Sequence, residues 1–168
     1  MATDILIVDD ERDIRSLISM TLEDEGYATK QAAGAAEARN LLLSEPPKLA
    51  IFDIWMRESD MDGLELLEWS KSIYPDLPVL MISGHGTVEI AVNAIKAGAY
   101  DFIEKPFKSE KLLFMVSRAL ENSELKKENE ELKQQVRRTD MIVGKSSIIN
   151  SIRQTIAKVS QTNSRVLI

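Results

Sequence analysis

The stretch FDIWMRESDMDG, residues 52–63, ends a run of apolar residues in an aspartate, Asp53, and follows it with an acidic loop and a glycine. The run LAIF at residues 49–52 is typical of a strand that is buried on both faces. Such a strand carries the carboxylate of Asp53 to the rim of a sheet. The neighbouring strands therefore decide what that carboxylate can do.

Similar short apolar runs alternate with helical patterns over residues 4–105. The other strands are expected at ILIV (5–8), YATKQA (27–32), PVLMI (78–82) and YDFI (100–103). Five strands that alternate with five helices predict an α/β fold, in which helices cover both faces of a parallel sheet. A sheet of this kind binds its ligands at the carboxyl ends of the strands.

The helices are marked by apolar residues at helical spacing and by glycines at their ends. Two apolar faces stand out, the first ended by Gly26 and the second by Gly98. The first consists of Ile14, Leu17, Ile18 and Leu22, and the second of Val88, Ala91, Val92 and Ile95. Two more helices are expected at residues 35–43 and 64–73, and a fifth begins near Ser109. The residues of the fifth helix that should face inward are Leu112, Met115, Val116 and Ala119.

The composition limits the classes of function. The chain has 168 residues, 44% of them apolar, which is enough for one domain with a core and an appendage. The absence of cysteine excludes disulfides, thiolate metal sites and thiol catalysis, and it suits a reducing cytoplasm. The N-terminus lacks the pattern of a signal peptide, and no apolar run approaches the ~20 residues of a membrane span. A net charge of −6 argues against nucleic-acid binding and favours a cation.

The sequence becomes strongly charged near residue 120, in ENSELKKENEELKQQVRR. Residues with heptad spacing in this region are Asn122, Leu125, Asn129, Leu132 and Val136. One interpretation is a solvated extension of the last helix. The other is a short parallel coiled coil of two chains, in which buried asparagines set the register. Residues 122–139 are therefore expected to form a helical linker that could pair as a short coiled coil.

Residues 141–168 have a different pattern, with an apolar helical face followed by the strand-like run RVLI. A chain that stops inside a strand is expected to be a fragment of a longer protein. The tripeptide GKS at residues 144–146 suggests a phosphate-binding loop. That motif requires a glycine five residues before its Gly-Lys pair, and Thr139 occupies this position, so we reject it.

Acidic residues follow two of the predicted strands. The first strand runs into Asp9, Asp10 and Glu11, and the third runs into Asp53. These strands are neighbours in a doubly wound sheet, so their carboxyl ends meet. Clustered carboxylates raise one another's pKa, and a hard divalent cation such as Mg²⁺ relieves the repulsion. A single acid such as Asp10 is more simply explained as a helix cap, but capping does not explain the whole cluster.

Two further polar groups are directed to the same rim. The fourth strand ends in SGHG at residues 83–86, where small residues leave the hydroxyl of Ser83 beside the pocket. The fifth strand is followed by Lys105 and Pro106. A lysine ammonium suits a phosphate group, and an X-Pro bond can be cis, which would aim the lysine inward.

This ordered set of acid pair, Asp, Ser and Lys-Pro resembles the receiver domain of bacterial two-component response regulators, over about residues 3–121. The resemblance implies a flavodoxin-like (CheY-like) five-stranded sheet of order 2-1-3-4-5. It also implies a role for each residue of the set. Asp53 would accept a phosphoryl group, Lys105 would pair with it, and the hydroxyl of Ser83 would move to it, so that these three residues form the catalytic set. Mg²⁺ would be bound by Asp9, Asp10, Asp53 and the backbone carbonyl of Trp55. Ser83 and Phe102 would form the switch. Phe102 lacks the hydroxyl of the tyrosine often found there, so switching would rely on packing.

The runs ISGHG and AIKAGAYDFIEKPF are further similar to regulators of the NtrC class, in which an AAA+ ATPase activates sigma-54 polymerase. On this resemblance, residues 1–121 are the receiver, 122–139 the linker and 140–168 the start of a truncated AAA+ sigma-54-interaction domain. Gly63 comes two residues later than in the usual receiver pattern. This longer loop resembles the NtrX branch of nitrogen regulators, whose partner kinase is the membrane sensor NtrY. The loop residues Arg57, Glu58, Asp60 and Asp62 are expected to be solvated.

The expected function is that of a response regulator in the bacterial cytoplasm. The chain would take a phosphoryl group on Asp53 from an NtrY-like sensor histidine kinase, in a Mg²⁺-dependent step. It would then change conformation and form homodimers through helix four, strand five and helix five, or through the helix at residues 112–138. It would catalyse only its own phosphorylation and dephosphorylation. ATP hydrolysis, DNA binding and contact with sigma-54 polymerase would belong to a longer parent, and the chain itself is not expected to bind a membrane.

Two functions of other classes fit parts of the pattern. A Mg²⁺-dependent phosphohydrolase can use an aspartyl nucleophile, but it usually carries DxD, and this chain has DIW at residues 53–55. A flavin-binding domain of the same fold needs a loop rich in hydroxyls and glycine after the first strand, where this chain has acids. Sustained turnover of a phosphate ester would favour the first alternative, and a yellow protein the second.

Overall fold

The computed structural model describes residues 3–57, 59–84, 87–139, 151–152 and 154. The chain divides into two compact units, Met1–Leu125 and Lys126–Ile168. The strands of the first unit are β1 (Ile5–Val8), β2 (Thr29–Ala32), β3 (Leu49–Asp53), β4 (Val79–Ser83) and β5 (Asp101–Glu104). The helices are α1 (Arg12–Asp24), α2 (Ala35–Ser44), α3 (Gly63–Ile73), α4 (Val88–Lys96) and α5 (Ser109–Thr139), the last of which continues into the second unit.

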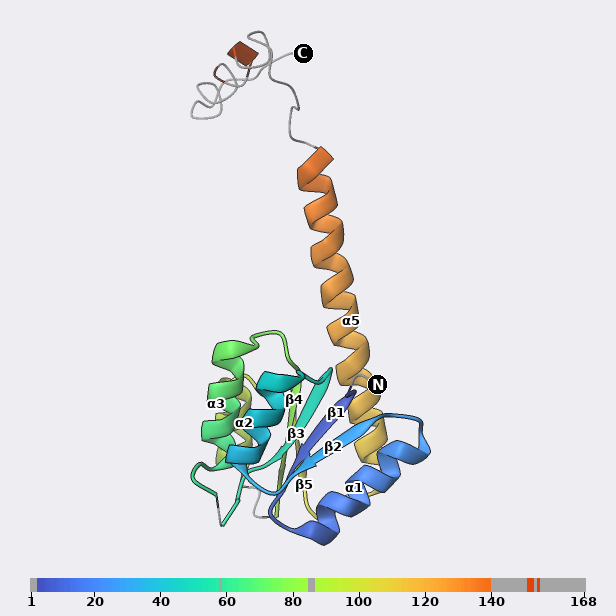
Figure 1. The fold of residues 1–168 in the computed structure, drawn as a ribbon, viewed down its shortest axis with the longest axis vertical. Helices are drawn as coiled ribbons and strands as arrows, with labels where there is room; N and C mark the ends of the chain where they lie inside the picture. Colours follow the sequence, from blue (N-terminus) through green and yellow to red (C-terminus); the bar gives the residue numbers. More distant parts are fainter. Residues whose placement is uncertain (1–2, 58, 85–86, 140–150, 153, 155–168) are drawn as a thin grey trace. The chain divides into compact units, whose positions relative to one another are not determined.

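The five strands form one parallel sheet in the order β2-β1-β3-β4-β5 (Figure 1). The predicted flavodoxin-like fold is therefore confirmed. The register aligns the strand ends: Val8 pairs with Phe52, and Asp53 pairs with Ile82. As a result, the residues that follow β1 and the last residues of β3 and β4 meet at one rim of the sheet.

Alternating side chains of the strands build two separate cores, because successive residues of a strand point to opposite faces. On one face, Leu6 and Val8 of β1 pack in a cluster with buried residues of α2, α3 and α4. On the other face, Ile5 and Ile7 pack in a cluster with buried residues of α1 and α5. The four predicted inward residues of α5, from Leu112 to Ala119, are all buried in this second cluster. Helices thus cover both faces of the sheet, as predicted.

Two of the predicted apolar faces are wrong in detail. On α1, Ile18 and Leu22 are buried, but Leu17 is 59% exposed, because the helix contacts the sheet along a narrower stripe than the sequence suggested. The error on α4 is larger, since the residues that pack on the core are Ile90, Ala94 and Ala97. Residues predicted for the apolar face but found exposed are Val88, Val92 and Ile95.

The last helix is continuous from Ser109 to Thr139, so the charged segment extends α5 without a break. Leu125 is 59% and Leu132 53% exposed, an exposure that both a solvated helix and an unpaired coiled-coil seam would show. The coiled coil and the proposed domain boundaries stay predictions. Most of residues 140–168, predicted to be the start of an AAA+ domain, and His85 and Gly86 of the SGHG run lie outside the described residues. In the part of the chain that is described, no helix is both long and apolar enough to cross a membrane.

Candidate functional site

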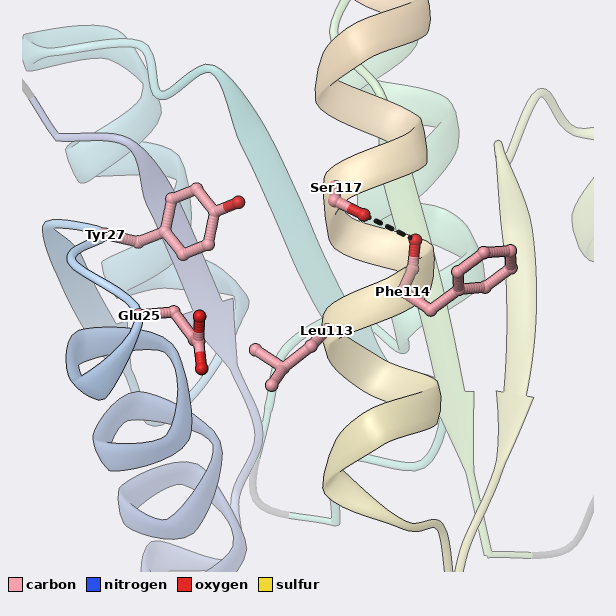
Figure 2. Close-up of a pocket in the computed structure, with 5 residues that line it drawn as sticks. All are labelled: Glu25, Tyr27, Leu113, Phe114 and Ser117. Carbon is pink, nitrogen blue, oxygen red and sulfur yellow. Dashed lines mark hydrogen bonds between the residues drawn. The ribbon is translucent and has the colours of Figure 1, made fainter.

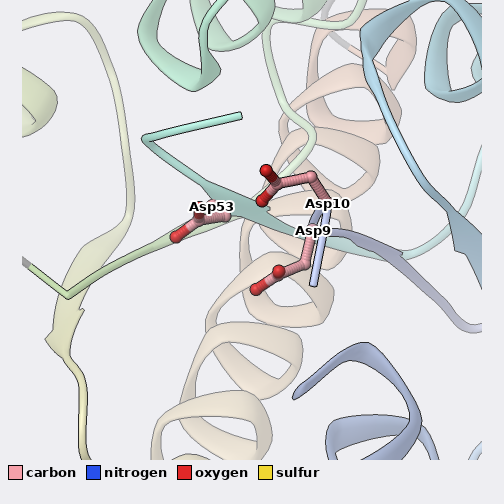
Figure 3. A group of neighbouring side chains, drawn as sticks. All are labelled: Asp9, Asp10 and Asp53. Carbon is pink, nitrogen blue, oxygen red and sulfur yellow. The ribbon is translucent and has the colours of Figure 1, made fainter. Parts of the chain in front are cut away.

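Three carboxylates from two adjacent strands gather at the rim of the sheet (Figure 3). Asp9 and Asp10 directly follow β1, and Asp53 is the last residue of β3. One carboxylate oxygen of each lies within 4.8 Å of the others. Asp9 is 1% exposed and Asp53 is 4% exposed, whereas Asp10 is half-buried. The predicted acidic cluster therefore forms, and its two most buried members come from neighbouring strands.

Local hydrogen bonds orient the two acids after β1. The backbone N–H of Glu11 donates to Asp9 Oδ1 over 2.8 Å. The backbone N–H of Arg57 donates to Asp10 Oδ2 over 3.1 Å. Asp10 does not cap α1, because the residue at the N-cap position is Glu11 and no side chain accepts a hydrogen bond there. The helix-cap explanation of Asp10 is thus wrong.

Lys105 places a positive charge among these acids. Its Nζ donates to Asp9 Oδ2 over 2.9 Å and lies 3.1 Å from Asp53 Oδ1. A third acid that the sequence analysis did not assign, Glu11, lies 3.7 Å away. Burial alone would lower the pKa of Lys105, but its hydrogen bond to Asp9 and the charge of Asp53 raise it. The Lys105–Pro106 peptide bond is cis.

Asp53 is the group whose ionisation the site changes most. Burial raises its pKa to about 6 and the charge of Lys105 opposes that rise, while the charges of Asp9 and Asp10 add to it. Among the described residues, Asp53 Oδ1 is one of only two buried side-chain atoms that lack a hydrogen-bond partner. The contact with Lys105 is thus an ion pair whose geometry does not make a hydrogen bond. A buried acceptor left over in this way is available to a ligand.

The remaining predicted residues lie around this cluster. Ser83 is completely buried at the end of β4, and its carbonyl accepts from the backbone N–H of Lys105 over 2.8 Å. Phe102 is half-buried on β5 and packs against the core that α4 covers. The side chain of Trp55 is 51% exposed, two residues beyond Asp53. The polar residues of the sequence set therefore occupy one rim of the sheet, and Phe102, the predicted switch residue, lies on β5.

A glycine allows α3 to begin directly against the site. The N–H of Gly63 donates to the carbonyl of Ile54 over 2.9 Å. A Cβ at this position would lie 2.0 Å from the backbone oxygen of Asp53. The side chain of Asp62 caps α3 in a capping box with Glu65. The DGLE pattern at residues 62–65 is a readable signature of that cap, which the sequence analysis missed.

The expectation of a solvated loop after Asp53 is confirmed for Arg57 and Asp60, which are exposed, and is wrong for Asp62, which is half-buried and caps α3. The exposed residues still make contacts: Asp60 lies 3.7 Å from Arg39 of α2, and the backbone N–H of Arg57 donates to Asp10. Ser59 Oγ accepts from the N–H of Ala35 at the start of α2. No sequence signal pointed to Ser59 or Arg39, because each is close to its partner only in space. Glu58 lies outside the described residues.

The cluster fits a divalent metal ion. Its donors are carboxylate oxygens, which suit hard cations, and three of them converge within 4.8 Å. Asp53 Oδ1, which is paired with Lys105 but accepts no hydrogen bond, could also ligate such an ion. Glycine and hydroxyl residues, which a flavin phosphate would need after β1, are replaced here by acids.

A cavity of about 230 Å³ lies between the end of α1 and α5, away from the acidic cluster (Figure 2). Its lining residues are Glu25, Tyr27, Leu113, Phe114 and Ser117. None of them belongs to the acidic cluster, so this cavity is not part of the site.

Comparison with known proteins gives this arrangement a family. The model of the response regulator receiver domain matches residues 5–117. The nitrogen assimilation regulatory protein NtrX of Azorhizobium caulinodans is 51% identical over 168 residues, which is 100% of this chain and 37% of that protein. The crystal structure of the receiver domain of NtrX from Brucella abortus is 52% identical with a TM-score of 0.69, and the match covers 70% of this chain and 98% of that one.

A more distant match is the solution structure of the beryllofluoride-activated NtrC4 receiver domain dimer. It is 39% identical with a TM-score of 0.67, over 71% of this chain and 98% of that one. The present chain spans little more than a third of the length of the curated NtrX protein. Fold, rim and comparisons agree: the chain belongs to the response regulator receiver domain family, on the NtrX branch of the NtrC class.

Proposed function

We propose that Asp53 accepts a phosphoryl group from a sensor histidine kinase and that its phosphorylation changes the conformation and self-association of the chain. The observation that carries the proposal is the state of the Asp53 carboxylate. It is 4% exposed, has one oxygen without a hydrogen-bond partner and faces one ammonium and two other acids. An acid with only a structural role would be expected to have its oxygens satisfied.

In the proposed transfer, an oxygen of Asp53 attacks the phosphorus of a phosphohistidine. The phosphorus–nitrogen bond breaks, its electron pair stays on the imidazole, and the product is an acyl phosphate on Asp53. A carboxylate is a weak nucleophile, so position and charge must carry the reaction. Lys105 supplies both, because its Nζ already lies 3.1 Å from Asp53 Oδ1, beside the place where the phosphoryl oxygens would gather.

A Mg²⁺ ion held by Asp9, Asp10, Asp53 and the backbone carbonyl of Trp55 would supply charge neutralisation for the acids and the phosphoryl oxygens. The chain prepares for such a cation with its own groups. The N–H groups of Glu11 and Arg57 hold the carboxylates of Asp9 and Asp10 in place. These hydrogen bonds fix the two carboxylates before a cation binds, which reduces the conformational entropy that binding costs.

Phosphorylation would then shift an equilibrium between two conformations that exists beforehand. Ser83 is buried at the end of β4, and its carbonyl accepts a hydrogen bond from the backbone N–H of Lys105. A phosphoryl group on Asp53 would therefore move these two residues together. Phe102 is only half-buried and can pack further inward. Because phenylalanine has no hydroxyl, this movement is a change of packing.

The surface that transmits the change is proposed to be α4, β5 and α5. Val88 is 82%, Val92 44% and Ile95 47% exposed, which is unusual for neighbouring aliphatic residues on one helix. The activated NtrC4 receiver domain is described as a dimer, which supports self-association of this chain. In the longer parent, we propose that the receiver controls an AAA+ ATPase, DNA binding and sigma-54 polymerase, with an NtrY-like kinase as the phosphoryl donor.

The first test is intact mass spectrometry of the 168-residue chain after incubation with Mg²⁺ and acetyl phosphate. The wild type should gain one labile phosphoryl group, and Asp53→Ala should gain none. Asp76→Ala, which changes an exposed aspartate, should be modified like the wild type. A phosphoryl group that persists in Asp53→Ala would contradict the assignment, and sustained hydrolysis of a phosphate ester, in place of acetyl phosphate, would indicate a phosphohydrolase.

The dimer proposal has a separate test. Light scattering of the phosphorylated wild type should show a change in mass relative to the unmodified protein. Val88→Glu places a charge on the exposed face of α4 and should abolish that change without preventing phosphorylation. An unaltered mass change in Val88→Glu would show that this face of α4 is not the interface.

A further inference from the structure

The loop of residues 55–62, which joins β3 to α3, is anchored to helix α2 although the two are distant in the sequence. We call it the β3–α3 loop. Its Met56 is buried in the core, and its Met61 packs partly against the same core. The loop lies beside the acidic cluster because it begins two residues after Asp53. Its contacts with α2 are therefore in a position to affect the site.

Ser59 of the loop caps α2 from outside the helix. The residue at the N-cap position is Gly34, which has no side chain to accept a hydrogen bond. Ser59 Oγ accepts instead from the N–H of Ala35, over 2.9 Å. A Cβ on Gly34 would lie 3.4 Å from Ser59 Oγ, so the loop packs directly on the start of the helix. The orphan donors at a helix N-terminus need such an acceptor, so this contact stabilises helix and loop together.

Arg39, on the next turn of α2, makes a second attachment. Its Nη1 lies 3.7 Å from Asp60 Oδ2 and 3.8 Å from the sulfur of Met61. The guanidinium also stacks over the ring of Trp69 on α3, with 5.3 Å from Cζ to the ring centroid. Arg39 of α2 thus contacts both the second half of the loop and Trp69 of α3. A half-buried guanidinium stacked on a tryptophan has less freedom than a solvated one.

The same loop also makes a hydrogen bond to the acidic cluster. The backbone N–H of Arg57, two residues before Ser59, donates to Asp10 Oδ2 over 3.1 Å. Asp10 is the most exposed of the three clustered acids and the one whose orientation depends on the loop. Asp9, by contrast, is held by its own neighbour Glu11 and by Lys105. A loop that moved away from α2 would carry the Arg57 N–H away from Asp10.

We propose that Ser59 and Arg39 are positioning residues that set the orientation of Asp10, by clamping the β3–α3 loop to α2, and thereby set the affinity of the site for Mg²⁺. The inference rests on the proposed function, because it assumes that the acidic cluster binds this cation. On this proposal, the longer loop serves to supply Ser59 and Asp60, the residues that contact α2.

The test is the dissociation constant for Mg²⁺ of the 168-residue chain, measured by isothermal titration calorimetry. Ser59→Ala should weaken Mg²⁺ binding about threefold to tenfold, the effect expected from one hydrogen bond. Ser59→Thr keeps a hydroxyl and should restore most of the affinity. Ser44→Ala is the matched control, because it removes a hydroxyl from the other end of α2 that bonds only within the helix.

A double-mutant cycle shows whether Ser59 acts through Asp10. In an Asp10→Asn background, Ser59→Ala should no longer change the dissociation constant, because the group it orients is gone. An equal effect of Ser59→Ala in both backgrounds would overturn the proposal. Lower thermal stability of Ser59→Ala in EDTA, with wild-type Mg²⁺ affinity, would also overturn it and leave Ser59 as a helix cap only.

Two further results separate the inference from the function on which it rests. If the wild type binds no Mg²⁺ at millimolar concentration, the proposed metal site fails, and the inference fails with it. If the wild type binds Mg²⁺ and Ser59→Ala binds it equally well, the inference alone fails. Should Ser59→Ala not fold, Asp60→Asn provides the second variant, since its side chain is 55% exposed and its pairing with Arg39 is part of the same clamp. Unchanged Mg²⁺ affinity in Asp60→Asn would then count against the proposal.

Discussion

Burial and charge act in opposite directions on the carboxylate of Asp53. Burial raises its pKa and the charge of Lys105 lowers it, and the net result is a pKa of about 6. The folded chain therefore keeps at the sheet rim an acid that is costly to ionise when no cation is bound. This cost is the reason to regard the residue as functional, because an exposed acid in its place would be easier to accommodate.

Asp53→Asn should stabilise the chain at pH 7.5 in EDTA, because it removes a buried charge that faces two other carboxylates. The expected gain in the free energy of unfolding is about 1–3 kcal/mol, from a pKa displaced from 3.8 to about 6. Urea denaturation followed by circular dichroism measures it. Asp76→Asn, at an exposed position, should change the stability little. A clear loss of stability in Asp53→Asn would show that the charge of Asp53 stabilises the fold.

Gly63 is required by the close approach of α3 to the site. In Gly63→Ala, the new Cβ would lie 2.0 Å from the backbone oxygen of Asp53, so the backbone must move. We expect a loss of about 2 kcal/mol or more in the free energy of unfolding, together with slower phosphorylation by acetyl phosphate. Gly84→Ala is a suitable control for stability, because the nearest atom to its Cβ would be 4.0 Å away. Wild-type stability in Gly63→Ala would mean that the start of α3 can shift without cost.

At the scale of the elements, alternation of apolar runs with helical patterns was enough to predict the strands, the helices and their order. The predicted and observed boundaries of the strands differ by at most two residues. The apolar run predicted for β3 ended at Phe52, but the observed strand continues into the polar rim and includes Asp53. The apolar face of α4 could not be predicted in the same way. Ile90, Ala94 and Ala97 pack on the core, whereas Val88 and Val92 are exposed, so the stripe of the largest aliphatic residues did not indicate the buried face.

Asp4 joins the starts of three strands and makes the stability depend on pH. Its carboxylate accepts from the N–H of Ala28 over 3.0 Å and pairs with Lys48 over 2.8 Å. The hydrogen bonds from Lys48 and Ala28 lower its pKa below 3.8 in the folded chain. A depressed folded pKa adds stability that is present above pH 3.8 and is lost as the pH falls through the folded value.

Asp4→Asn should therefore destabilise the chain by about 1 kcal/mol at pH 7, the net value of a charge-assisted hydrogen bond. The difference from the wild type should be constant between pH 7 and pH 5 and should shrink as the pH is lowered toward 3. Urea midpoints across this range measure it. A difference that grows on acidification would contradict the assigned direction of the pKa shift.

At the scale of the whole molecule, the receiver and the charged end of α5 are separate compact units. The first unit, Met1–Leu125, contains the sheet, both cores and every residue of the acidic cluster. The described residues of the second unit contribute an ion pair between Lys133 and Glu130 on the surface of the helix. Exposed pairs of this kind add little to stability.

A chain that ends at Leu125 should consequently keep the fold, the stability and the Mg²⁺-dependent phosphorylation of the longer one. We expect its free energy of unfolding to lie within about 0.5 kcal/mol of the 168-residue value, the range of changes remote from a core. Thermal melting and intact mass after treatment with acetyl phosphate check both points. A loss of phosphorylation on truncation would show that residues 126–168 contribute to the site.

The sequence by itself determined the fold class and the identity of the rim residues, and the strand order followed from the resemblance to receiver domains. Apolar periodicity encodes which elements form, and Asp9, Asp53, Ser83 and Lys105 each adjoin a strand end, so the parallel sheet brings them together. Only the tertiary structure decided how the β3–α3 loop is used. Ser59 and Arg39 acquire their partners through contacts between elements that are far apart in the chain, and nothing in local propensity or periodicity encodes such contacts. The same holds for the carboxylate of Asp53, whose raised pKa arises from burial and from neighbouring charges that only folding assembles.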